Sequence, residues 1–564
     1  MKFLLKKKLE LIVILFLITY SFSINFYYGF QGFNYVDSFQ HIAGGKLVLE
    51  GNIPFKDYWM TNSGPMMDFV QSFFFKVAGI SWNSLVLNAS FFNILFTLNT
   101  YFFCKLLNLD NIFKFTLSLC AATIMYPTSG TPLVDYHAII TSMIGLTYFL
   151  FFLKKKNYFY LGFTPIFFII ALFFKQVPSF YIALIIFFLS ITLYFYQDKK
   201  VLYSQIIGSF FAVLFSILFI KFVGIKLIDI YEQYFLMPLF EYNIREKTFD
   251  TSFFSTSQKI RYVIFLIIPS IIILYLKLKE KFINKDDRLN LFLLFGLFFT
   301  SVIHESYTWN QATTLGFLPF ISALIVKLLN DKNKIITYLF YFLSFGLILR
   351  LASKDLFYLI LLLVPFFIFK TKLDFFKNKI NLLVVLYTLL TTLIYYDKLI
   401  STRKWQDIYN PEWKKSYINA ALLDKKLKGL RWISNNPNTK EEFLKTKKNL
   451  KYIKDSLTNE KFIIITHYQI YNMILGVKNF SPAKYWWADS SYPITNKKLN
   501  KKFNNLFINK IKNNDIEKII VLDDVVIGDF DITNFDWLVK CSSIEKEASS
   551  NFRIVYKINK LCLN

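Results

Sequence analysis

The stretch Asn34-Tyr-Val-Asp-Ser-Phe-Gln-His-Ile-Ala-Gly-Gly-Lys46 opens a polar segment that runs to Gly79. This segment closely follows the first apolar run, yet it carries three aspartates, a histidine, two prolines and several glycines. A plain connector between two membrane helices needs none of these residues. Because most of the chain from there to about residue 396 is hydrophobic, we predict that the loop holds the catalytic carboxylate of a membrane enzyme. Most of the helices would then build the cavity that this loop faces.

The composition is that of a multi-pass membrane protein. The chain has 564 residues, of which 55% are hydrophobic and 20% aromatic, and its mean hydropathy is +0.40. A soluble protein of this length needs more polar surface. The formal net charge of +27 comes from 65 Lys and Arg against 38 Asp and Glu. Much of this charge lies in short clusters between apolar runs, where it sets membrane orientation, so we expect no nucleic-acid partner.

The apolar runs can be counted as membrane spans. Residues 1–10 are basic and residues 11–28 mostly apolar, with no clear small-residue cleavage site after them, which predicts an uncleaved first span with a cytoplasmic N-terminus. A span needs ~20 apolar residues, each rising about 1.5 Å. About thirteen spans result, and those after the first are 84–103, 112–128, 138–153, 158–174, 178–196, 202–222, 260–276, 289–303, 315–330, 335–350, 355–369 and 381–396.

Alternate connectors differ in charge. Those expected in the cytoplasm are basic, as the positive-inside rule requires: they contain Lys105, Lys154–Lys156, Lys199–Lys200, Lys277–Arg288, Lys332–Lys334 and Lys370–Lys379. The opposite connectors, together with everything after about residue 397, contain most of the aspartate, histidine, glutamate, tryptophan and proline. These connectors are 29–83, 129–137, 175–177, 223–259, 304–314 and 351–354. Polar chemistry is therefore predicted on the outer side. Residues 29–83 are called the first outer loop below.

The last third of the chain changes character. We predict a membrane domain over 1–396, a charged and mostly helical stem over 397–461, and a small α/β domain on the outer face over 462–564. Phe462–Thr466 and Ile519–Leu522 are typical of buried strands, with a helix over Lys501–Asn513 between them. Short strands over Trp537–Lys540 and Phe552–Lys557 would complete the sheet. Cys541 and Cys562 either form a disulfide in an oxidising compartment or remain two thiols.

Three aspartates of the first outer loop are candidates for chemistry. Asp37 comes shortly after the first span and could act as a general base, bind a metal, or cap a helix that starts at Ser38. Asp57 and Asp68 lie near Pro54 and Pro65, in a context that suits turns and helix starts.

The first outer loop resembles that of the type C glycosyltransferases, especially the protein-mannosyltransferase-like and aminoarabinose-transferase-like branch. Those families show an acidic residue after the first span, Gly-x-x-Pro-Tyr/Phe, a following aspartate, and a Pro-Pro-Leu-like turn. Here the matching residues are Asp37, Gly51-Asn-Ile-Pro54-Phe55, Asp57 and Gly64-Pro65-Met66. Ser38 stands where an acidic neighbour often follows the aspartate, and Thr61-Asn-Ser-Gly-Pro65 replaces the usual His/Lys-x-Pro-Pro turn. The first departure argues against a metal site in this loop.

The resemblance implies a transferase that uses a polyprenyl-phosphate-linked sugar on the periplasmic side of a bacterial inner membrane. Asp37 would be the base that activates the acceptor hydroxyl. The leaving group is an anionic lipid phosphate, so cations should line the membrane side of the cavity. The acceptor, whether a glycan, a lipid or a protein, is not specified, and no cofactor is required, although a divalent metal remains an alternative.

Further candidates lie on the predicted outer side. Asp135 and His137 end the second outer loop and could assist the base, bind a metal, or simply form a polar turn. Lys175 lies between two otherwise uncharged spans, where it either contacts the donor phosphate or snorkels to the surface. Two arginines could also touch phosphate, and a His-Glu pair could form an acceptor-binding wall: Arg245, Arg261, His304 and Glu305.

Two other functions compete with glycosyl transfer. A flippase of lipid-linked glycans would be expected to carry charges near the bilayer midplane and broken helices in paired halves. Here the charges lie at the ends of spans. A protein like the O-antigen polymerases or ligases would share the cationic outer face but would not need the early loop that carries Asp37. No Walker loop, Rossmann glycine set, HExxH or Gly-x-Ser-x-Gly motif is present.

Overall fold

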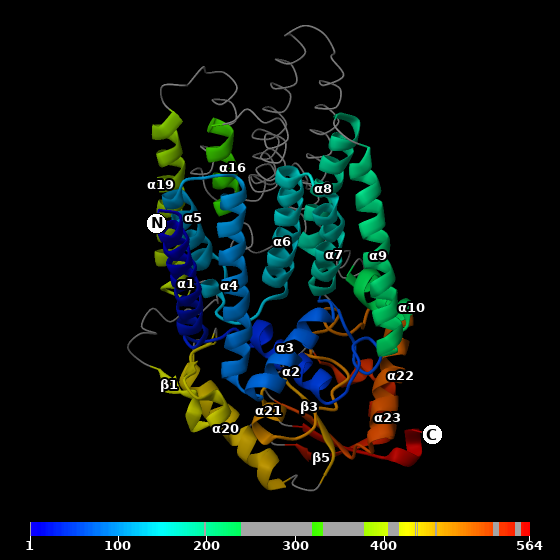
Figure 1. Cartoon of the computed structure of the whole chain (residues 1–564). Coiled ribbons are helices and arrows are strands. Elements are labelled where there is room, and N and C mark those ends of the chain that lie inside the picture. The colour runs from blue at the N-terminus through cyan, green and yellow to red at the C-terminus, as the bar shows by residue number, and fades with distance from the viewer. Residues whose placement is uncertain are drawn as a thin grey trace, which may run out of the picture.

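The computed structural model describes the chain apart from residues 1, 62, 197–198, 239–317, 331–376, 404–416, 435, 437, 457–459, 523–529, 548–553 and 564. Figure 1 shows a bundle of long helices at one end of the molecule and a small sheet at the other. The short helices α2 (Tyr35–Leu49) and α3 (Met66–Ala78) lie between the bundle and the sheet.

The long helices follow the predicted apolar runs. They are α1 (Lys2–Gly29), α4 (Trp82–Leu106), α5 (Asn111–Ile124), α6 (Val134–Lys155), α7 (Tyr158–Phe174), α8 (Gln176–Tyr196), α9 (Lys200–Val223), α16 (Leu318–Asn330) and α19 (Lys377–Tyr395). In the part of the chain that the structure describes, four stretches are long and apolar enough to cross a membrane: Lys7–Gly29, Trp82–Leu106, Val134–Lys155 and Lys200–Val223. The chain is thus a multi-pass membrane protein. Four predicted spans (260–276, 289–303, 335–350 and 355–369) lie outside the described residues, so the count of thirteen stays a prediction.

Two basic connectors lie close together, and one of them contacts the first helix. Lys105, at the end of α4, pairs with Glu10 of α1. Lys154, at the end of α6, donates a hydrogen bond of 2.7 Å to Asn108 Oδ1 in the connector after α4. The connectors after the second and fourth predicted spans are therefore at one end of the bundle, as the charge alternation requires. The first outer loop is at the other end, beside the sheet (Figure 1).

The polar stretch that opens the first outer loop forms α2. Asn34 caps this helix, because its side chain accepts hydrogen bonds from the amides of Val36 and Asp37. Asp37 therefore lies inside the first turn, and the alternative in which it caps a helix starting at Ser38 is wrong. The amide side chain of Asn34 takes the capping position three residues earlier. This leaves the Asp37 carboxylate at the positive end of the helix dipole.

Two adjacent glycines let α2 pack closely on α3. A Cβ atom at Gly44 would collide with the Asp68 carboxylate, and one at Gly45 would lie 2.7 Å from Cγ of Gln71. At this point the backbone of α2 lies directly against side chains of α3. Any side chain larger than hydrogen would push α2 away from α3.

The C-terminal part contains a four-stranded sheet in the order β3-β4-β6-β5. Strands β3 (Phe462–Ile465) and β4 (Lys518–Val521) pair in parallel, joined through α22 (Lys497–Asn514), as the sequence predicted. The strands β6 (Ile554–Ile558) and β5 (Ser542–Glu547) follow antiparallel. The strand predicted over Trp537–Lys540 is wrong. This segment belongs to the helix α23 (Asp536–Cys541), whose Leu538 is buried, and the strand begins at Ser542.

In its described residues, the segment before the sheet contains short strands and turns as well as helix. It contains the π-helical turn η6 (Tyr396–Ile400), the strands β1 (Ile418–Asn419) and β2 (Arg431–Trp432), and α20 (Thr439–Ser456). Short 3-10 turns lie between β1 and β2. The β2 strand carries Trp432, whose side chain is fully buried beneath α20 and hydrogen-bonds to Glu442. Because this segment is rich in charged residues, its sequence did not indicate the apolar contacts that hold it in place.

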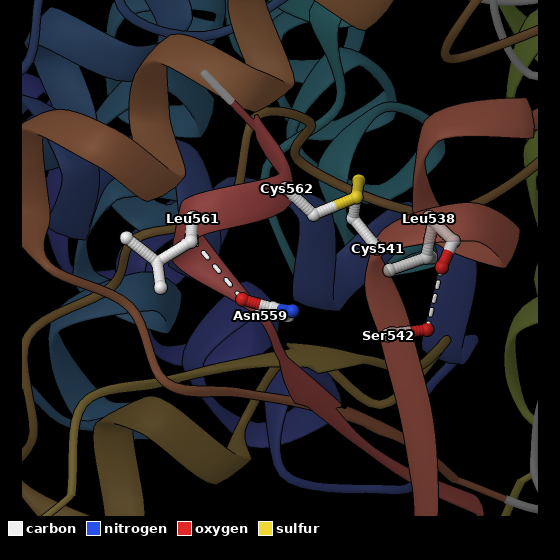
Figure 2. Close-up of a disulfide and its surroundings, with 6 residues drawn as sticks. All are labelled: Leu538, Cys541, Ser542, Asn559, Leu561 and Cys562. Atoms are coloured by element: carbon white, nitrogen blue, oxygen red, sulfur yellow. Dashed lines mark hydrogen bonds between the residues drawn. A yellow bond between two sulfur atoms is a disulfide. The ribbon is translucent and has the colours of Figure 1, made fainter.

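Cys541 and Cys562 form a disulfide, which resolves the alternative left open by the sequence. Figure 2 shows it joining the end of α23 to the turn η11 (Lys560–Leu563). In the same view the Asn559 side chain accepts from the Leu561 amide and the Ser542 hydroxyl donates to the Leu538 carbonyl. The bond fastens the C-terminus to the sheet and suits an oxidising compartment.

Arg403 is a buried cation that the sequence analysis overlooked. It follows η6 and is fully enclosed. Its guanidinium donates four hydrogen bonds of 3.0 to 3.1 Å to backbone carbonyls. The acceptors are those of Gln31, Pro127, Thr128 and Ser129. Arg403 therefore joins the last bundle helix to the start of the first outer loop and to the second outer loop.

We expect Arg403→Lys to destabilise the protein by on the order of 3 kcal/mol, because a lysine cannot supply the planar fork and leaves buried carbonyls without donors. The thermal unfolding of the purified protein in detergent measures this loss. Arg431→Lys is the matched control, since Arg431 is half-buried and stacks over Tyr417, and it should change stability by less than about 1 kcal/mol. Equal effects of the two substitutions would contradict the role of Arg403.

Candidate active site

Three segments that carry candidate residues meet at the sheet end of the bundle. The hydroxyl of Ser38, next to Asp37, lies 3.0 Å from that of Thr131 in the second outer loop. The amide of Gly64 donates 2.8 Å to the carbonyl of Phe174, the residue before Lys175. The first outer loop thus touches both the loop that leads to Asp135 and the end of α7. The candidate carboxylates and the candidate lysine belong to one contiguous region.

Asp37 is half-buried on the first turn of α2. The cap at Asn34 and the Ser38–Thr131 contact fix this turn on either side of it. Tyr35 stacks on Tyr468, with ring centroids 5.3 Å apart, and so joins the same turn to the C-terminal part. Asp37 is thus a partly solvent-accessible carboxylate on a turn whose position is fixed by these contacts.

Lys175 and Asp135 form an ion pair. The lysine Nζ lies 2.8 Å from Asp135 Oδ2, and both side chains keep partial exposure, at 28% and 20%. Lys175 begins the link between α7 and α8, while Asp135 is in the first turn of α6. The pair lies at the end of the bundle where the first outer loop contacts the end of α7.

His137 has different partners from Asp135. Its ring is fully buried, accepts or donates at Nδ1 with the Tyr126 hydroxyl, and lies 3.1 Å through Nε2 from Asn88 Oδ1. Asn88 in turn donates to Gln71 Oε1 at 2.9 Å. The sequence pattern of an aspartate close to a histidine therefore does not form a joint site, because the two side chains leave α6 towards different neighbours.

Asp57 closes a turn. Its Oδ2 accepts a 2.7 Å hydrogen bond from the amide of Ile53, four residues earlier. Phe55, between them, has a positive φ of 66°, so the carboxylate stabilises a tight bend of the backbone. This is the structural role that the neighbouring Pro54 indicated, and Asp57 keeps a half-exposed side chain beside it.

A buried ion pair that the sequence analysis missed joins the loop to the C-terminal part. Asp68 of α3 is fully buried, accepts from the Tyr58 hydroxyl at 2.8 Å, and lies 3.2 Å from Lys484 Nζ. Lys484 also donates to Ser63 Oγ at 2.9 Å. Burial raises the pKa of the Asp68 carboxyl, while the Lys484 ammonium and the Tyr58 hydroxyl oppose that rise. Nothing in the stretch Ser481-Pro-Ala-Lys484-Tyr-Trp-Trp indicated a partner so distant in sequence.

His41 lies on the same face of α2 as Asp37, one turn further on. It is fully buried, and neither ring nitrogen has a hydrogen-bond partner among the described residues. Burial, with the Lys484 ammonium nearby, lowers the pKa of His41 well below its ordinary value. The ring is therefore neutral at physiological pH.

Several further contacts run from the first outer loop to the C-terminal part. The amide of Trp59 donates to the Pro482 carbonyl at 2.7 Å, and the amide of Asn479 donates to Glu50 Oε2 at 2.9 Å. Lys510 of α22, which is buried, donates to Asn52 Oδ1 at 2.6 Å and to the Asp57 carbonyl at 2.9 Å. The loop is held along its length by residues from beyond position 478.

The remaining predicted site residues lie outside the described residues. They are Arg245, Arg261, His304 and Glu305. Within the described ranges, no group of three or more His, Cys, Asp or Glu side chains is arranged to hold a metal ion.

Neither a protein-family model nor a curated protein matches this sequence. The solved structures to which the chain is similar include two of ArnT and one of an oligosaccharyltransferase. ArnT from Cupriavidus metallidurans bound to undecaprenyl phosphate is 9% identical, with 96% of this chain and 97% of that chain covered and a TM-score of 0.39. Apo ArnT from the same organism is 11% identical, with 97% of this chain and 98% of that chain covered and a TM-score of 0.44. The oligosaccharyltransferase of Archaeoglobus fulgidus, tethered to an acceptor peptide, is 12% identical (98%, 74%, 0.33). With TM-scores below 0.5, these likenesses carry no argument about residues or substrates.

Lys510 makes stability depend on pH in a defined direction. Burial lowers its pKa from 10.5 to about 8. Between about pH 8 and pH 10.5 the unfolded chain therefore binds more protons at this residue, so its contribution to the free energy of unfolding rises with pH. We expect the difference in thermal midpoint between the wild type and Lys510→Met to grow in favour of the wild type from pH 7.5 to pH 9.5.

The control is Lys498→Met on the same helix, whose side chain is 75% exposed. Its difference from the wild type should stay constant over that range. Parallel pH curves for the wild type and both variants would contradict the lowered pKa of Lys510.

Proposed function

We propose that this protein is a membrane glycosyltransferase that moves a sugar from a polyprenyl-phosphate-linked donor to an acceptor on the outer, periplasmic side of the membrane. One observation carries the proposal. The turn that bears Asp37 touches the second outer loop through Ser38 and Thr131, and the same loop touches the end of α7 beside Lys175. A carboxylate and an ammonium are thus held in one region at an end of the membrane bundle, as transfer from an anionic lipid requires.

Each of these charged residues has a role in the proposed reaction. Asp37 accepts the proton of an acceptor hydroxyl while the oxygen attacks the anomeric carbon of the donor sugar. The bond between that carbon and the phosphate oxygen breaks, and the lipid phosphate leaves with the electron pair. Lys175 offsets the charge that develops on the phosphate. Asp135 keeps the Lys175 ammonium in place before the donor arrives, at 2.8 Å.

The distribution of charge favours an enzyme over a flippase. In the four described spans, the charged residues lie near the helix ends: Lys7, Lys8 and Glu10 in α1, Lys105 in α4, Asp135, Lys154 and Lys155 in α6, and Lys200 and Lys221 in α9. A transporter that moves an anionic headgroup through the bilayer would be expected to carry charged groups near the bilayer midplane. No observation favours a polymerase-like or ligase-like function over simple glycosyl transfer.

We expect Asp37→Asn to lower sugar transfer by about 100-fold or more, since general-base catalysis contributes roughly that factor and the amide cannot accept the proton. Transfer is assayed in membranes with polyprenyl-phosphate sugars of several kinds as donors, with and without EDTA. The substitution preserves the shape of the side chain, so the thermal midpoint should change little.

Asp110→Asn is the matched control, because Asp110 is exposed in the connector after α4. It should retain wild-type transfer. Wild-type rates for Asp37→Asn in a folded, inserted protein would overturn the assignment of the base. Loss of transfer in EDTA alone would show that a divalent metal takes part.

We expect Lys175→Gln to lower kcat/KM for the lipid donor by about 10- to 100-fold, the worth of one charge-assisted hydrogen bond to phosphate. Lys156→Gln, an exposed lysine between α6 and α7, should have no effect. If Lys175 only snorkels, the two variants will behave alike in a titration of donor concentration.

A further inference from the structure

The segment that follows Gly476 reaches into the first outer loop. Lys484, whose side chain is only 2% exposed, pairs with the fully buried Asp68 and with Ser63. Around this pair, the backbones of Trp59 and Ala483 form an isolated parallel bridge. The ion pair is therefore enclosed by the two segments that it joins and has no contact with bulk water.

Asp68 connects this ion pair to α2. Its carboxylate lies against the bare backbone of Gly44, where a Cβ atom would collide with it. Positions 37, 41 and 44 follow the spacing i, i+4, i+7, so they share one face of the helix. The face of α2 that carries Asp37 is therefore the face that rests, two turns later, on Asp68.

We infer that Lys484 is a positioning residue for Asp37: through its ion pair with Asp68 and the contact of Asp68 with Gly44, it fixes the helix that carries the catalytic carboxylate. The C-terminal part of the chain is then an integral component of the active site. This inference rests on the proposed function for the role of Asp37, but the contact chain from Lys484 to α2 stands on geometry alone.

The physical basis is the cost of an unpaired charge in a buried place. Without Lys484, the Asp68 carboxylate keeps Tyr58 but loses its counter-ion, so it must take up a proton or move towards water. Movement towards water would shift the group on which Gly44 rests. Because an active-site base needs its position held to a fraction of an ångström, a small rotation of α2 impairs the chemical step more than donor binding.

The test compares Lys484→Met, Asp68→Asn and the double variant in the full-length protein. We expect each single variant to lower kcat at least tenfold with a change in donor KM of less than threefold. We also expect amide hydrogen exchange in α2 to be faster at least tenfold while exchange in β3 and β4 stays unchanged. The double variant, which buries no unpaired charge, should recover most of the α2 protection.

Two further variants complete the design. Lys478→Met removes an exposed lysine from the same segment and should leave both readouts at wild-type values. Gly44→Ala breaks the next link of the chain and should speed α2 exchange, whereas Gly162→Ala, where a Cβ atom has its nearest neighbour at 3.7 Å, should not. If Lys484→Met does not fold, the double variant and Gly44→Ala decide the question.

Unchanged α2 exchange in Lys484→Met or in Gly44→Ala would overturn the inference, as would exchange that rises equally in the sheet. The proposed function fails separately, through an active Asp37→Asn or a wild type that transfers no sugar. In that case the exchange measurements still decide whether Lys484 positions α2.

Discussion

The buried carboxylate of Asp68 pairs with an ammonium that lies 416 residues away in the chain. Asp68 lies beneath α2 in the first outer loop, and Lys484 belongs to the segment before α22. The pair joins the first outer loop to the C-terminal part, and the loss of either partner would leave the other charge buried without its counter-ion. Trp59 and Glu50 of the first outer loop also contact the C-terminal part, and Lys510 of α22 contacts the first outer loop. Figure 1 shows the result, with α2 and α3 enclosed between the bundle and the sheet.

Arg403 is a second buried cation, and it joins separate segments of the chain on the bundle side. Its guanidinium donates hydrogen bonds to the carbonyls of Gln31 and of the turn from Pro127 to Ser129. These loops contain irregular backbone, which cannot be buried unless its carbonyls find donors. One planar guanidinium supplies four, so the first and second outer loops keep a fixed separation. Ser38 and Thr131 can then meet, and the turn that bears Asp37 has a defined place relative to Asp135 and Lys175.

Much of this arrangement was predictable from local pattern. Apolar length and the alternation of basic connectors predicted the helices of the bundle, because hydrocarbon thickness and membrane orientation act on composition alone. The Gly51-to-Phe55 motif and the position of Asp37 after the first span predicted the loop class. Trp537–Lys540 was assigned to a strand because four residues carry too little periodicity to separate a strand from a helix. The sequence also could not decide whether Asp57 stabilises a turn or takes part in chemistry, since an aspartate suits both roles.

The sequence by itself determined the membrane class, and it predicted the sidedness of the polar loops and the candidate carboxylate. Each of these depends on residues near one another in the chain, where periodicity, charge and helix capping act. Only the tertiary structure decided that Asp135 pairs with Lys175, that His137 turns into the core, that Cys541 bonds to Cys562, and that Lys484 supports the helix of Asp37. Electrostatic pairing acts over a few ångströms in space and is independent of distance along the chain, so no local pattern records it.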